Sequence, residues 1–378
     1  MTSTPGFGSR LFLTGALAFI ATGMLSSLFG VALPVYARSF GLSEGQGTVL
    51  LSLYGLGAFL TVVVGIFAAR LLTLWRGLIA IAAGVGLLAL QLNWLLMLIG
   101  GGLAGIGLGM LAVVVNRQFL ASFGARGPGM VGMVNAVFGL GAIISPLVFV
   151  WAGGLPALVF AGIGVLALLT LPIVQPDRSL AAETAGLPHL AQWPLLILVF
   201  NVFSAMIEVG LIGLGPTALM ANGIDGFDAA RLVSAFSVCF LVGRLSLYWL
   251  TRLVGSDLLF LLSLTGTALC MGLSAAGLPA IGFVLAGGFI GMFFPTFYVW
   301  AIGVLKDARM GSVILCAGLS AVTVCPVILG LILEATGQGA LFAIMAIVAG
   351  LLALAFLPTL IWARRGGQTK LSDPCPLT

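Results

Sequence analysis

The sequence is poor in charged residues. Only 7% of its 378 residues are Asp, Glu, Lys or Arg, and 61% are hydrophobic, whereas an ordinary soluble domain is about 25% charged. A chain with so little charge cannot present a surface that water wets, which excludes a soluble globular protein and makes lipid its main solvent. In lipid every backbone N–H and C=O group must be bonded internally, so only helices and closed barrels can span.

The residues that build catalytic, metal and nucleotide sites are also scarce. The sequence has one histidine, His189, no CxxC spacing among its five cysteines, and no G-x-x-x-x-G-K-[ST] motif. We therefore expect no metal site, no cofactor, no ATP-driven step and no enzyme activity. The net charge of +5 comes from basic residues scattered over short loops, which excludes the basic patch of a nucleic-acid-binding protein.

Long apolar runs are what the sequence has in abundance. Each lasts about 20 residues, the length that a membrane-spanning helix needs, and none shows the period-two alternation of barrel strands. The sequence therefore predicts an all-α integral membrane protein with twelve transmembrane helices. The predicted spans are 11–36, 44–69, 76–92, 94–116, 130–153, 155–174, 194–221, 228–250, 257–275, 278–304, 310–333 and 339–362.

The distribution of basic residues predicts the orientation of the chain. Twelve of the fifteen Lys and Arg residues fall on one side of the membrane if the N-terminus is inside, two fall outside (Arg38 and Arg231), and Arg244 lies within a span. Because loops rich in Lys and Arg stay in the cytoplasm, we expect both termini to be cytoplasmic. The membrane is expected to be a bacterial-type inner membrane.

The two halves of the sequence match each other at a constant offset of 182 residues. The matches include Pro34 and Pro216, Gly41 and Gly223, Arg70 and Arg252, and the glycine-rich segments 100–110 and 282–292. A parallel repeat in a hydrophobic chain is typical of a transporter made of two pseudo-symmetric halves. The predicted divisions are an N-terminal six-helix half over 1–174, a cytoplasmic linker over 175–193, and a C-terminal six-helix half with a short tail over 194–378.

The loop after the second predicted span combines glycine with basic residues. Gly65, Arg70 and Arg76 fit a pattern in which Ala69 stands where an aspartate is usual. In this loop, and in its spans, linker and repeat, the chain resembles the major facilitator superfamily over nearly its full length. The resemblance implies twelve helices in two halves. Arg70 and its repeat mate Arg252 are assigned to gating, and the aspartate of the usual charge-relay latch is absent from both copies of this loop.

Three further segments narrow the resemblance. They are similar to the fucose-permease-like branch of the superfamily. The segments are residues 135–146, residues 208–217, in which Glu208 precedes glycines and a Pro-Thr pair, and the dipeptide Gly243-Arg244. The chain departs from that branch at Asn135, where many members carry histidine, and at Leu214 and Ala218, where aromatic residues are common. Sugars are usually held by aromatic faces and polar edges, so these departures weaken a sugar assignment.

Three charged residues break the internal repeat and are candidates for function. Glu208 aligns with Ser26, Arg244 with Val62, and Arg117 with Val299. Glu208 lies about 21 Å into its span at 1.5 Å per residue, where a carboxylate costs several kcal/mol unless it is paired, hydrated or protonated. We therefore predict Glu208 as the proton-coupling residue, with a permanent bond to a neighbouring helix as the alternative.

The remaining candidates supply binding and gating groups, each with a plainer alternative. Arg244 either faces the central cavity, where it binds an anionic group or Glu208, or snorkels to the inner surface. Arg117 and Asn116 lie at the inner end of the fourth run, where anchoring of the helix at the cytoplasmic surface is favoured over contact with a ligand. The other predicted substrate-binding residues are Asn135, Asn201 and Thr217, which also serve as helix–helix bonding groups. Pro34 and Pro216 are predicted to loosen their helices for an outer gate, or simply to curve them.

These features favour a secondary active transporter that acts as a monomer. It is expected to move a small organic solute by alternating access, with proton-coupled uptake as the leading prediction. Proton-antiport efflux of amphipathic compounds is the alternative, because the interior is apolar. A membrane-embedded enzyme would need paired catalytic groups, and a receptor would be expected to carry a soluble signalling region; neither is present in the sequence.

Overall fold

The computed structural model describes residues 5–123, 126–175, 192–305 and 310–369, and within them it is helical without strands. The predicted linker, 175–193, lies almost wholly outside these residues. The long helices are α1 (Pro5–Phe40), α2 (Glu44–Phe67), α3 (Leu74–Leu90), α4 (Trp94–Phe123), α5 (Gly127–Trp151), α6 (Pro156–Thr170), α7 (Gln192–Ala221), α8 (Gly226–Leu253), α9 (Ser256–Ala275), α10 (Pro279–Leu305), α11 (Met310–Thr336) and α12 (Leu341–Thr369). Three short 3-10 helices are η1 (Ala69–Leu71), η3 (Leu171–Ile173) and η4 (Gln338–Ala340).

Each long helix coincides with one predicted apolar run, which confirms the all-α, twelve-helix fold class. In the described residues, eleven helices are long and apolar enough to cross a membrane. The exception is α3, whose 17 residues span about 25 Å. Three boundaries were wrong by six or seven residues: α1 begins at Pro5 instead of residue 11, α12 ends at Thr369 instead of residue 362, and α4 continues to Phe123 instead of ending at residue 116. Residues 117–123 of α4 contain no glycine or proline, the residues that would stop a helix.

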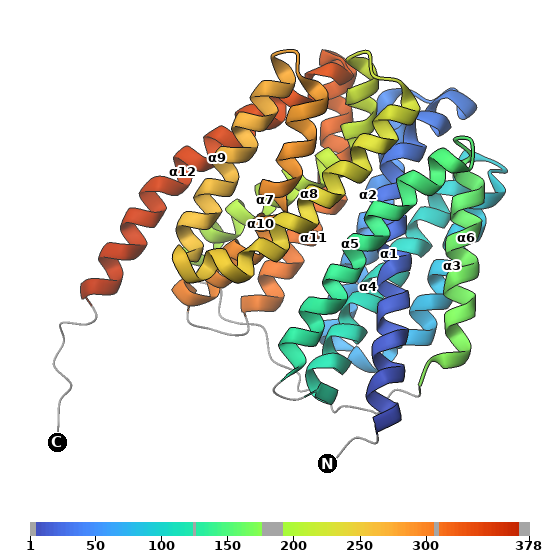
Figure 1. Cartoon of the computed structure of the whole chain (residues 1–378), viewed down its shortest axis with the longest axis horizontal. Coiled ribbons are helices and arrows are strands. Elements are labelled where there is room, and N and C mark those ends of the chain that lie inside the picture. Colours follow the sequence, from blue (N-terminus) through green and yellow to red (C-terminus); the bar gives the residue numbers. More distant parts are fainter. Residues whose placement is uncertain (1–4, 124–125, 176–191, 306–309, 370–378) are drawn as a thin grey trace.

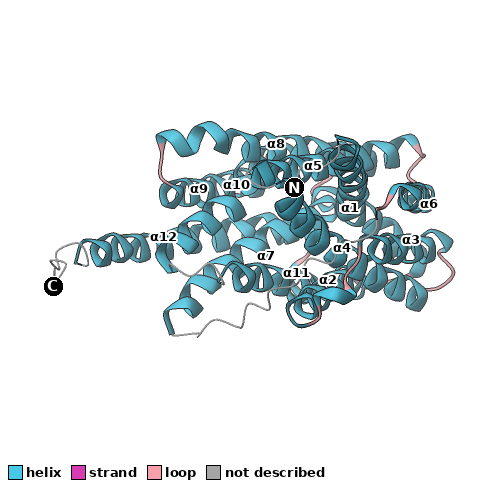
Figure 2. Ribbon diagram, turned by 90° about the horizontal axis from the view of Figure 1, so that it is seen from below, coloured by secondary structure: helices cyan, strands magenta, loops and turns pink. Residues whose placement is uncertain are grey.

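The helices form two bundles that lie side by side (Figure 1), with α1–α6 drawn from blue to green and α7–α12 from yellow-green to red. The described start of α1 and the described end of α12 lie at the same end of the molecule, which we call the inner end; the opposite one is the outer end. Viewed from the inner end (Figure 2), α1, α2 and α5 face the other bundle. The main contacts between the bundles are α1 with α7, α2 with α11, and α5 with α8, and α1 also touches α8.

The turns after α1 and α7 have the same geometry at positions 182 residues apart. Gly41 and Gly223 both have positive φ angles, 62° and 86°, which glycine adopts without the steric penalty that a side chain brings. The following N–H bonds back to the preceding helix in both turns, from Leu42 to Ala37 O at 3.0 Å and from Ile224 to Leu219 O at 3.2 Å. Such bonds satisfy carbonyls at a helix C-terminus.

The helices that follow these turns begin with equivalent side-chain caps. The Ser43 hydroxyl accepts a hydrogen bond from Gln46 N at 3.3 Å, and the Asp225 carboxylate accepts one from Phe227 N at 2.9 Å. Such caps satisfy N–H groups that the first turn leaves without a partner. Because 43 plus 182 is 225, the caps, like the glycine turns, repeat in register.

Glycines bring the second and fourth helix of each bundle into close contact. A side chain at Gly105 would collide with the backbone of Tyr54, and one at Gly287 with the backbone of Phe236. These pairs are again related by 182, as are the contacts of Gly109 with Ala58 and of Gly291 with Phe240. Small residues allow such an approach between apolar helices. The glycine ladders of α4 and α10 therefore pack helices within each bundle and do not form the interface between bundles.

The bundles meet at the outer end and near mid-height. Going inward from the outer end, α2 meets α11 through Gly45 with Glu334, Thr48 with Gly330, and Gly55 with Val322. The Ser234 hydroxyl of α8 donates to Ile143 O of α5 at 2.8 Å, and Gly30 of α1 packs on the backbone of Ile212 of α7. Near the inner end of α5, Gly129 and Gly132 have open space where a side chain would project.

Candidate functional site

A cavity of about 200 Å³ lies among α7, α8, α10 and α11. Its polar lining residues are Asn201, Ser204, Glu208 and Arg244, and its apolar walls include Phe293, Phe294, Leu315, Leu319 and Val322. The cavity contains one potential anion and one cation, and every lining residue comes from the second bundle. The N-terminal repeat has no counterpart to either charge.

One face of α7 supplies three of the four polar groups. Asn201, Ser204 and Glu208 are spaced at i, i+3 and i+7, so they project from the same side of the helix. The Glu208 side chain is half-buried and lines the cavity. Within the described part of the chain its carboxylate has no hydrogen-bond donor and no direct ion pair. Glu208 therefore lines a cavity within the second bundle, and its role in proton coupling stays a prediction.

Arg244 is held against α8 and α10 by two contacts. Its guanidinium carbon lies 4.6 Å from the centroid of the Phe240 ring, a cation–π geometry, and its Nε donates to Gly291 O at 3.4 Å. Arg244 lines the cavity within the second bundle, and its predicted role in binding stays a prediction. Its charge and that of Glu208 interact electrostatically across this space without direct contact.

Asn201 has a structural bond as well as a cavity position. Its Nδ2 donates to Ile314 O of α11 at 2.6 Å, and the side chain is buried. The Ser204 hydroxyl donates to Asn201 O at 3.1 Å within α7. One of these bonds joins α7 to α11 and the other lies within α7, so the charged groups are the main polar features available to a ligand.

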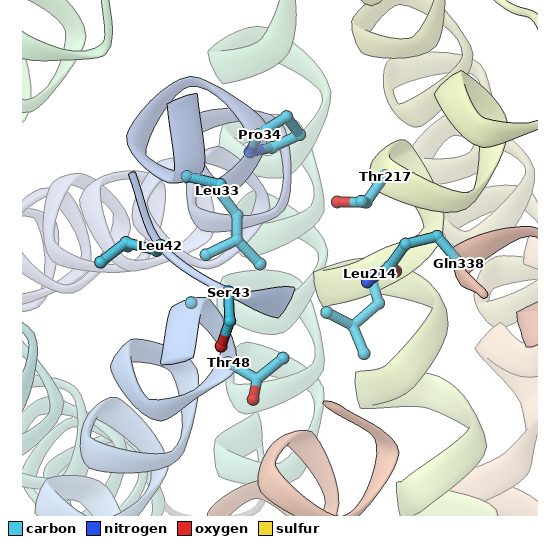
Figure 3. Close-up of a pocket in the computed structure, with 10 residues that line it drawn as sticks. Leu33, Pro34, Leu42, Ser43, Thr48, Leu214, Thr217 and Gln338 are labelled. Atoms are coloured by element: carbon cyan, nitrogen blue, oxygen red, sulfur yellow. The ribbon is translucent and has the colours of Figure 1, made fainter. Parts of the chain in front are cut away.

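Thr217 and Pro34 lie elsewhere, in a second pocket near the outer end. This pocket has a volume of about 50 Å³ and lies between α1, α2 and α7. In Figure 3 the Thr217 hydroxyl points toward Leu33 and Pro34 across the pocket. The described residues lining it carry no charge, so we place the functional site in the larger cavity. Thr217 and Pro34 belong to the region where the bundles close together.

Asn135, Asn116 and Arg117 are also outside the larger cavity. Asn135 Nδ2 donates to Val131 O of its own helix at 2.9 Å. Asn116 and Arg117 lie inside α4, because that helix runs on to Phe123, and among the described residues Asn116 Oδ1 and Arg117 Nε are buried without hydrogen-bond partners.

The predicted gating arginines are both on the surface near the inner end. Arg70 lies in η1 and Arg252 in the last turn of α8, and both are exposed. Arg252 stacks over the Tyr248 ring at 4.4 Å. Pro216 lies within α7. The gating roles of these residues stay predictions.

Sequence reasoning missed the aromatic wall of the cavity. Phe293 and Phe294 precede Pro295 in the middle of α10, and Ser204 lies between the two polar residues predicted on α7. The helical spacing of Ser204 was a usable signal. The phenylalanines had none, because α10 is apolar on every side and its pattern does not indicate which face meets a cavity. In the part of the chain that the structure describes, no three His, Cys, Asp or Glu residues are grouped as a metal site.

Comparison with known proteins identifies the fold. No protein-family model and no curated protein matches the sequence, but solved structures match its three-dimensional arrangement. A D-xylose-proton symporter gives a TM-score of 0.75 at 12% identity, covering 93% of this chain and 97% of that one. The chain has the major facilitator fold. With eleven helices able to span a membrane, it is a multi-pass membrane protein.

Two other structures with the major facilitator fold match over similar lengths. The nucleoside transporter NupG gives a TM-score of 0.70 at 15% identity, with 93% of this chain and 98% of that one covered. The major facilitator transporter FucP, in its outward conformation, gives 0.58 at 19% identity, with 91% and 98% covered. At these identities the similarity establishes the major facilitator fold, while the closer resemblance to the fucose-permease-like branch stays a prediction.

Proposed function

We propose that the protein is a secondary active transporter that moves a small organic solute by alternating access, with Glu208 as the proton-coupling residue. The observation that carries the proposal is the position of Glu208 beside a cavity halfway along the helices, where Arg244 is the one other charged residue among the described residues that line it. A carboxylate at this depth is costly unless it is protonated or compensated. A change in its surroundings therefore changes its tendency to bind a proton.

The contacts between the bundles support alternating access. They join the bundles at the outer end and near mid-height through glycines and small residues, and the cavity extends along α11 from Val322, the innermost of the α2–α11 contacts named above, to Leu315 nearer the inner end. This is the arrangement of an inward-facing state, from which the second state follows by separating the outer contacts. The two bundles can rock against each other as rigid units, because each bundle is packed internally by its own glycine contacts.

The experiment requires a ligand and then a proton measurement. A thermal-stability screen of the purified chain against metabolites and hydrophobic dyes selects solutes, because a ligand of the folded state raises the melting temperature. The chosen solute is then added to proteoliposomes that contain a pH-sensitive dye. We expect solute entry to carry protons in the wild type and Glu208→Gln to abolish accumulation against a gradient.

The matched control is Asp228→Asn, which neutralises a carboxylate that is exposed near the start of α8 and pairs with Arg231 of the same helix. It is expected to keep coupled transport. Wild-type proton movement in a folded Glu208→Gln protein would remove Glu208 from the mechanism. If no solute moves protons with the wild type, proton coupling itself is wrong.

Proton-antiport efflux of amphipathic compounds is the second candidate. The observation in its favour is the apolar wall formed by Phe293, Phe294, Leu315 and Leu319. The same proteoliposomes distinguish the directions, since an antiporter releases protons as solute enters. We also propose an inner-membrane location with both termini cytoplasmic. Labelling of Cys375, as the single cysteine of a variant, by an impermeant reagent in intact cells would overturn that orientation.

A further inference from the structure

We infer that the solute of this cavity is a small monocarboxylate with a compact apolar body, bound through its carboxylate to Arg244. The inference rests on the proposed function and names the substrate class of the same site. Among the described residues, Arg244 is the one cation that lines the cavity.

Arg244 is arranged in advance to bind a carboxylate. Stacking on Phe240 and the Nε bond to Gly291 O fix the plane of the guanidinium. Neither of its Nη groups has a protein acceptor among the described residues. A planar guanidinium with that edge available binds the two oxygens of a carboxylate side by side. Because the protein already holds the group in place, little side-chain freedom is lost on binding.

The charges in the cavity balance only if the anion arrives with a proton. Arg244 and ionised Glu208 together are neutral, so a bound carboxylate would leave a net negative charge inside the membrane. Such a charge is costly in a lipid surrounding. A proton on Glu208 restores neutrality, and the carboxylate then takes the place of Glu208 as the electrostatic partner of Arg244. The expected stoichiometry is one proton for each carboxylate.

The walls of the cavity favour a compact apolar body over a sugar or an amine. Phe293, Phe294 and Leu319 offer apolar surface, whereas the Asn201 amide and the Ser204 hydroxyl already donate to backbone carbonyls. A sugar would bury several hydroxyls with few partners, which costs free energy for each. An amine would bring a second positive charge close to Arg244.

The test compares acids with amides of the same shape. Linear and branched carboxylates from acetate to hexanoate, including 3-methylbutanoate, are measured against their primary amides by calorimetry and thermal stability on the purified full chain. Binding is the readout because short acids cross lipid unaided in their neutral form. We expect at least one acid to bind and its amide to bind about tenfold more weakly or not at all, as expected for loss of a charged hydrogen-bond pair.

Variants assign the effect to Arg244. Arg244→Gln is expected to lose the preference for the acid, and Arg244→Lys to keep part of it, because lysine retains the charge without the planar fork. Arg231→Gln is the matched control, since Arg231 lies on the same helix but is exposed and paired with Asp228 at 2.7 Å. If Arg244→Gln does not fold, the acid–amide comparison on the wild type still decides.

The outcomes separate this inference from the proposed function. Equal binding of acids and amides, preference for the matching amines, or no binding by any acid of the series overturns the inference. If another solute is accumulated with protons through Glu208, the transport proposal stands and the carboxylate assignment fails. If an acid binds through Arg244 but no solute is ever driven by a proton gradient, the carboxylate site stands and proton-coupled transport fails.

Discussion

The two bundles have the same turns, helix caps and glycine contacts, but only the second has charged residues at the candidate site. The turns after α1 and α7, the caps of α2 and α8, and the glycine contacts of α4 and α10 lie at positions 182 residues apart. At the position of Glu208 the first bundle has Ser26, whose hydroxyl is bonded to Tyr54 OH at 3.0 Å, and at the position of Arg244 it has the buried Val62. The repeated positions are those that folding requires, and the candidate site lies where the repeat is broken.

The largest expected effect comes from moving the carboxylate to the other bundle. The double variant Glu208→Ser with Ser26→Glu puts a glutamate at the symmetry-related position, where Val62 replaces the arginine. We expect proton-driven accumulation to fall to the level of protein-free liposomes, because the new carboxylate has no cation opposite it. Ser26→Ala alone is expected to stay within about fivefold of wild type, since a neutral hydrogen bond contributes only about 1 kcal/mol. Restored coupling in the double variant would show that the two positions are equivalent.

The next largest effect tests whether equivalent glycine contacts contribute equally to the stability of the two bundles. Gly105→Ala and Gly287→Ala each place a methyl group against the backbone of a neighbouring helix, and overpacking of this kind costs about 1 to 3 kcal/mol. We expect similar drops in melting temperature for both variants in detergent. Gly272→Ala, at a helical position with open space, is expected to have no such cost. A large drop in only one bundle would break the comparison.

A smaller effect is expected where the bundles touch. Gly30→Ala places a methyl group against Ile212 O, which opposes closure of the outer end. A cost of about 1.4 kcal/mol corresponds to a tenfold shift in population. We expect labelling of a cysteine introduced at Thr217 to become faster by about that factor in the Gly30→Ala background. Unchanged labelling would mean that the outer end opens elsewhere.

The smallest effect concerns the caps. Ser43→Ala and Asp225→Ala each remove one side-chain acceptor at an exposed helix start, at a cost of about 1 kcal/mol. Thermal unfolding is expected to show two small and similar losses. A loss at one cap several times larger than at the other would indicate that the two helix starts differ in their tertiary support.

The sequence predicted the fold better than the site. The twelve apolar runs, the offset of 182 and the depth of Glu208 all follow from length, spacing and charge. The structure has the helices where they were expected, and Glu208 and Arg244 line one cavity. Asn135 and Thr217 were placed at the site because they are polar groups within spans, but they project elsewhere. In helices that are apolar all round, sequence does not indicate which face meets a cavity.

The crossing of α1 and α7 has a consequence for the movement of the outer end. Pro34 and Pro216 have no N–H, so the carbonyls four residues earlier, at Gly30 and Ile212, lose their helical donors. Gly30 and Ile212 are themselves related by the offset of 182, and the Ile212 carbonyl packs on Gly30. The atoms of α7 nearest to Gly30 are thus backbone atoms. Because no rotamers are frozen when such a contact forms, closing the outer end at this point carries no penalty in side-chain entropy.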